Sequence, residues 1–134
     1  MPLVTVIHSR ECSPSWKEES FGLALWKLCE SLPERITEIV NRENSRYGSS
    51  GHLGLTDTRI VFVEHGPFDI NPADVHFLVE LNVDFSKGQC ELIRDILAII
   101  IREKIGHLVA TIVLEVNVVG WCGARIEGEV ITST

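Results

Sequence analysis

Apolar and polar residues recur along this 134-residue chain in patterns that predict both strands and helices. Alternating apolar residues, or runs rich in β-branched side chains, are typical of strands. They predict strands at residues 2–8, 58–64, 75–85, 109–118 and a short edge strand at 124–131. The first strand starts at Pro2, so we expect ladder hydrogen bonds to hold this end of the chain in place.

A helical spacing of apolar residues predicts three helices. They cover residues 16–31 after an N-cap at Ser15, residues 33–44, and residues 88–105. Pro33 separates the first two because proline suits the first turn of a helix. Gly106 is expected to be the C-cap of the last helix. Segment 46–54 is rich in glycine and serine, which predicts a flexible loop and a candidate lid.

The order of these elements predicts the fold. It reads strand, helix, strand, and then strand, helix, strand, followed by the tail strand. Each half is expected to be a βαβ unit with parallel strands and a right-handed crossover. We therefore predict a single α+β domain over residues 1–134, with one four-stranded sheet and both helical segments on one face.

Composition narrows the classes of function. A net charge of −7 argues against duplex nucleic acid, because such affinity comes largely from Lys and Arg. The longest apolar run, 96–101, is far below the ~20 residues of a membrane span, so we expect a soluble, cytoplasmic protein without a membrane partner. Four cysteines and five histidines are scattered without metal-ligand spacing, which predicts reduced thiols and no metal site.

Four places along the chain carry a resemblance to the tautomerase superfamily. They are the start Met1-Pro2-Leu3, the strands 58–64 and 74–79, the segment 82–87 before a helix, and the turn 117–121 with Arg125. Together with the element order, they resemble 5-carboxymethyl-2-hydroxymuconate isomerases and, more distantly, macrophage migration inhibitory factor and malonate semialdehyde decarboxylase. The resemblance implies a homotrimer, a small carboxylate substrate, no cofactor, and removal of Met1 to make Pro2 the first residue.

The implied chemistry needs a base that works near neutral pH, and Pro2 is the candidate catalytic residue. Ordinary α-amino groups titrate near about 8, and burial among apolar neighbours such as Leu3 and Phe62 disfavours the cation. The nitrogen is basic only once Met1 is removed. The alternative is that Pro2 is a structural proline at a strand start.

A cation should hold the substrate carboxylate and stabilise the dienolate oxygen. Lys87 is the first candidate, because it matches by position a basic residue of the relatives. Arg59 is the second, near a paired basic position whose other member is Asp57 in this chain. The alternative for both is a charge facing water.

Four further residues complete the candidate list. Trp121 is a candidate wall of the substrate site, with a core tryptophan as the alternative. Arg125 is a third candidate cation. His65 and His76 are candidate proton donors, although histidines on strands commonly have structural roles. Segment 109–114 lacks the polar groups that polarise the carbonyl in the cytokine-like members.

The sequence thus predicts a cofactor-independent isomerase for a small unsaturated keto or hydroxy carboxylic acid. One alternative is a catalytically silent trimer of the same fold that binds a ligand or a protein. Another is an unrelated ferredoxin-like binding domain, because a shared element order does not fix function.

Overall fold

The computed structural model describes residues 2–9, 21–46, 54, 57–66, 73–81, 85–109, 111–120 and 123–132, with residues 46, 118–120 and 123–132 through their backbone. These ranges hold two helices and five strands. In chain order they are β1 (Leu3–His8), α1 (Phe21–Arg46), β2 (Arg59–Glu64), β3 (Val75–Leu81), α2 (Lys87–Ile105), β4 (Thr111–Gly120) and β5 (Gly123–Thr132).

The strands form one mixed sheet in the order β2-β1-β3-β4-β5. β1 is parallel to β2 and β3 is parallel to β4, so each helix connects a parallel pair, as predicted for two βαβ units. β1 and β3 join the two units in antiparallel fashion. The prediction of four strands is wrong by one, because β5 pairs with β4 of the same chain and extends the sheet.

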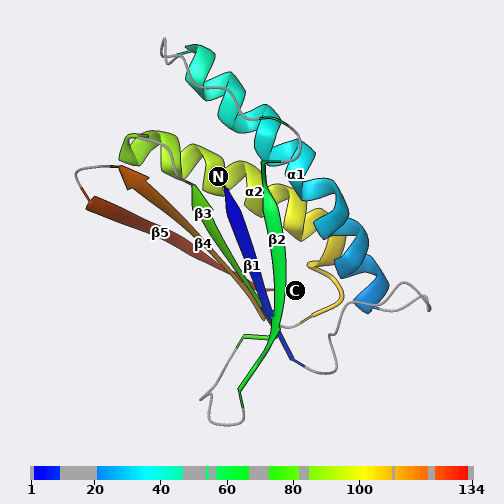
Figure 1. The fold of residues 1–134 in the computed structure, drawn as a ribbon. Helices are drawn as coiled ribbons and strands as arrows, with labels where there is room; N and C mark the ends of the chain where they lie inside the picture. The colour runs from blue at the N-terminus through cyan, green and yellow to red at the C-terminus, as the bar shows by residue number, and fades with distance from the viewer. Residues whose placement is uncertain are drawn as a thin grey trace.

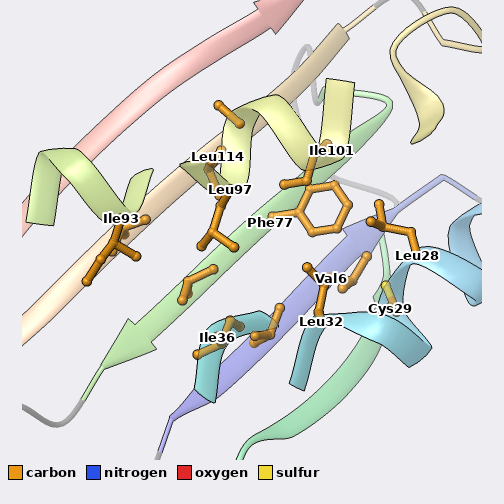
Figure 2. Close-up of a cluster of buried hydrophobic side chains, with 14 of the residues drawn as sticks. Val6, Leu28, Cys29, Leu32, Ile36, Phe77, Ile93, Leu97, Ile101 and Leu114 are labelled. Atoms are coloured by element: carbon orange, nitrogen blue, oxygen red, sulfur yellow. The ribbon is translucent and has the colours of Figure 1, made fainter. Parts of the chain in front are cut away.

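Both helices lie on one face of the sheet, and no described element covers the other face (Figure 1). Strand alternation sends every second side chain toward the helices. In the centre, Val6, Phe77 and Leu114 are register neighbours on β1, β3 and β4. Side chains of α1 and α2 close over them (Figure 2), and this core also includes Leu28, Leu32, Leu97 and Ile101.

α1 corrects the prediction of two helices separated at Pro33. It is one helix of 26 residues with Pro33 inside it. A proline inside a helix costs ~3 kcal/mol or more. The apolar stripe of Leu28, Leu32 and Ile36 nevertheless continues past it, and each such side chain gains roughly 1.5–3 kcal/mol by burial against the sheet. Burial therefore outweighs the local defect.

Parts of two other predictions lie outside the described residues. Ser15 and the start of the predicted helix at 16–20 belong to segment 10–20. Of the predicted loop, Arg46 ends α1 and Gly54 is described, whereas 47–53 are not.

α2 begins one residue earlier than predicted and is fixed at both ends. Ser86 and Gln89 form a capping box, in which the Gln89 amide donates to Ser86 Oγ at 3.2 Å. Gly106 is the C-cap, as predicted, but its backbone is right-handed. It needs to be glycine because a Cβ there would lie 2.5 Å from the Arg102 carbonyl oxygen. Neither described helix carries an apolar stretch long enough to cross a membrane.

Candidate functional site

Pro2 is held in place at the start of β1, an inner strand of the sheet. It is buried and directly precedes β1, which has β2 on one side and β3 on the other. The amide of Arg59 donates to the Pro2 carbonyl oxygen at 3.0 Å. Pro2 is therefore tied to the sheet.

Several elements begin or end at the same end of the sheet as Pro2. We call these strand ends the Pro2 edge. β2 starts here because it is parallel to β1, and β3 ends here because it is antiparallel. β4 also ends at the Pro2 edge and β5 starts from it. α1 returns to the Pro2 edge and α2 departs from it (Figure 1). Residues distant in sequence thus surround Pro2.

Among the candidate cations, Arg59 is the one whose backbone is hydrogen-bonded directly to Pro2. It is the first residue of β2 and pairs with Leu3. Its neighbour Ile60 packs against the core, so alternation places the Arg59 side chain on the uncovered face of the sheet. Arg59 is exposed, and no ion pair engages it within the described ranges.

Lys87 lies on the other side of the sheet. It is the first residue of α2, in the helical layer, and it is exposed. Three residues later the Cys90 thiol donates to the Val116 carbonyl oxygen at 3.5 Å, which places the start of α2 over β4. The first turn of α2 holds no acidic residue. Lys87 therefore adds its charge to a helix N-terminus that favours anions.

Arg59 and Lys87 do not converge on one face. Arg59 is on β2 and the start of α2, with Lys87, lies over β4 on the opposite face. β1 and β3 lie between these two strands. Arg125 is farther from Pro2. Its Cα pairs with that of Val118, which pairs with Leu81 beside Pro2, so it lies three strand spacings away, roughly 14 Å. Trp121 lies outside the described residues.

The two candidate histidines lie toward the opposite edge. His65 follows the end of β2, and its amide donates to the His8 carbonyl oxygen at 2.9 Å. His76 pairs with Ile7, five residues from Pro2 or roughly 17 Å along the strand. Its Nε2 lies 3.5 Å from Glu115 Oε1. Neither histidine is placed to exchange a proton with Pro2 in the same chain.

Two buried polar side chains at or near the Pro2 edge were missed by the sequence analysis. Thr58 is 8% exposed and, if the register continues by one residue, lies beside Pro2. Glu43, 1% exposed, lies in the last turn of α1. Thr58 Oγ1 and Glu43 Oε1 have no hydrogen-bond partner in the described structure. The sequence does contain a signal for Glu43, because its spacing from Ile36 and Val40 places this carboxylate on the buried apolar face of the helix.

Cysteine chemistry does not contribute at the described positions. Cys29 and Cys90 are buried and are not joined in a disulfide, whereas Cys12 and Cys122 lie outside the described residues, so the reduced state of the four thiols stays a prediction. Burial raises the pKa of Cys29 to about 12, which leaves very little nucleophilic thiolate at neutral pH.

Metal binding has no support in this part of the chain. Across the described ranges, no group of three His, Cys, Asp or Glu side chains is placed to hold a metal ion.

No family model, no curated protein and no solved structure matches this chain.

Proposed function

We propose that this protein is a cofactor-independent isomerase of the tautomerase type, similar to 5-carboxymethyl-2-hydroxymuconate isomerase, with Pro2 as its base. The observation that supports the proposal is the placement of Pro2. It is buried at the start of a strand paired on both sides, and its carbonyl is bound by the Arg59 amide.

The proposed reaction is a proton transfer between two carbons of a small unsaturated keto or hydroxy acid. Removal of Met1 turns the Pro2 nitrogen into a secondary amine, and its burial favours the neutral form. The neutral nitrogen takes a proton from carbon, and the C–H electron pair moves into a dienolate. The new N–H then returns the proton to the other carbon.

Binding is assigned to the two cations that flank the Pro2 edge. Lys87, together with the free amides of the α2 N-terminus, holds a carboxylate on the helical side. Arg59 binds the second acid group or the dienolate oxygen on the uncovered side. Arg59 on β2 and the start of α2 over β4 are three strand spacings apart, roughly 14 Å, so both long side chains must reach toward Pro2 to hold one small substrate. Arg125 stays a third candidate cation and Trp121 a candidate wall of the proposed site.

A homotrimer is the proposed assembly, with active sites between subunits. The uncovered sheet face carries apolar side chains that include Leu3, Ile7, Val61 and Val63, and the last two are 40% and 43% exposed. The outer edges of β2 and β5 also have no strand partner among the described residues. Contacts with other copies would cover this face and these edges.

The test is ketonisation of 2-hydroxymuconate-type and phenylenolpyruvate-type enols, followed by ultraviolet absorbance. The mature protein should convert a carboxylate enol, and Pro2→Ala should be strongly impaired. Intact mass spectrometry of the same sample should show that Met1 is absent. A retained Met1, or a fully active Pro2→Ala variant, would contradict the proposed base.

The uncovered apolar face also supports a second candidate, a catalytically silent trimer that binds a ligand or protein. This candidate predicts the same mass in solution but no turnover of any enol, and it tolerates a retained Met1. A monomer without turnover would instead favour a ferredoxin-like binding domain.

A further inference from the structure

A groove between the two helices lies apart from the Pro2 edge. It encloses about 260 Å³ and is lined by Ala24, Lys27, Leu28, Ser31 and Lys104. We propose that this groove is a second binding site, and that it takes a small organic anion with an apolar body, such as a medium-chain monocarboxylate.

The sequence creates the hollow by placing small residues at a helix contact. Ala24, Leu28 and Ser31 are spaced by four and three residues, so they share one face of α1. Ala24 and Ser31 leave room where longer side chains would fill the space toward α2. The Ser31 hydroxyl donates to the Leu28 carbonyl oxygen at 2.8 Å, so the only side-chain donors left to an anion are the lysines.

The two lysines make the groove positive in a chain with a net charge of −7. Lys27 and Lys104 are both exposed, and neither takes part in an ion pair within the described ranges. Glu30 is three residues after Lys27 and Glu103 directly precedes Lys104, but no ion pair joins these carboxylates to the two lysines in the described structure. Lysine stems extend over apolar surface while their ammonium groups stay in water. The groove thus offers two cations above an apolar floor.

The position of the groove separates it from the proposed catalytic site. Residues 24–31 belong to the first half of α1, and Lys104 to the last turn of α2. α1 runs toward the Pro2 edge and α2 runs away from it, so the first half of α1 and the last turn of α2 lie toward the His8 end of β1 (Figure 1). The cavity is slightly smaller than the roughly 300–1,000 Å³ of common ligand pockets, which limits the occupant to a small molecule.

The test is a titration of the full ¹⁵N-labelled protein with octanoate, followed by amide chemical shifts. Octanol and octylamine are the matched ligands, with the same tail but no charge or the opposite charge. Lys27→Glu removes one cation from the groove. Arg42→Glu makes the same change of charge on the same helix, roughly 22 Å away, and is the matched control. Ala24→Leu fills the hollow without any change of charge.

Octanoate should bind saturably, with shifts concentrated at residues 24–31 and around Lys104. Lys27→Glu should weaken binding by about fivefold or more, the upper range for an exposed ion pair, and Arg42→Glu by less than twofold. Ala24→Leu should weaken octanoate and octanol alike. Equal binding of octanoate and octanol, equal effects of Lys27→Glu and Arg42→Glu, or shifts located elsewhere would overturn the proposal. Pro2→Ala should bind octanoate as the wild type does, so this result is independent of the proposed isomerase activity.

Discussion

The buried thiol of Cys29 should make the stability of the fold sensitive to alkaline pH. Cys29 is 3% exposed, and burial raises its pKa from 9.0 to about 12. Because the pKa is raised in the folded state, its contribution is fully present below pH 9 and is lost as pH rises toward 12. Unfolding lets the thiol ionise, so between pH 7 and 10 the folded state should lose about 1.4 kcal/mol from this group alone.

The assay is urea denaturation of the wild type and of Cys29→Ala at several pH values from 7 to 10. The cavity left by the substitution gives a constant offset, and other titrating groups are common to both proteins. The difference in free energy of unfolding should therefore shrink by about 1.4 kcal/mol over this range. A difference that stays constant with pH would refute the reasoning, as would rapid reaction of native Cys29 with a thiol reagent at pH 8.

The remaining predictions concern activity, assembly and one helix end. Pro2→Ala should depress kcat more than KM, because it keeps a terminal amine but makes it primary and less constrained. Lys87→Ala should lower kcat/KM for a carboxylate enol by roughly ten- to a hundredfold, equivalent to about 1.5–3 kcal/mol, with an unchanged circular dichroism spectrum. If Arg59→Ala has this effect instead, the assignment of the first clamp is wrong but the proton-transfer proposal remains. Light scattering should give about 45 kDa, three times 15.0 kDa, and a monomer at micromolar concentration would contradict the trimer. Gly106→Ala should destabilise the fold by about 1–3 kcal/mol in urea, because its Cβ would press on the Arg102 carbonyl, and an unchanged midpoint would contradict that contact.

Local pattern predicted most of the elements because burial and periodicity agree along them. The alternation from Val75 to Leu81 follows the observed burial residue by residue. The apolar spacing of α2 is confirmed at Ile93, Leu97 and Ile101, which are buried, but Leu92 is 37% exposed. The sequence predicts a break at Pro33 that the structure does not have, because the sequence shows the cost of a proline but not the sheet that stabilises the helix on both sides of it. The sequence predicts the fifth strand as an element. Its pairing with β4 of the same chain depends on the tertiary structure, which local sequence does not show.

The sequence offers candidate site residues but not their geometry. Resemblance pointed to Pro2, Arg59 and Lys87, and the topology brings all three to one edge of the sheet. Whether a side chain leaves the covered or the uncovered face depends on register, which a sequence without its strand partners does not define. Thr58 and Glu43 were missed because their burial is a property of the assembled layers.

The place of β1 in the sheet also affects how the chain folds during synthesis. β1 emerges first, yet its partners come much later, with Leu3 pairing with Arg59 and with Glu80. β1 is an inner strand of the sheet, so its apolar side chains stay exposed until β2 and β3 have been made. Such long-range pairings slow folding and leave a nascent chain open to association with others. The residue proposed as the base is thus made well before the two strands that hold β1 in place.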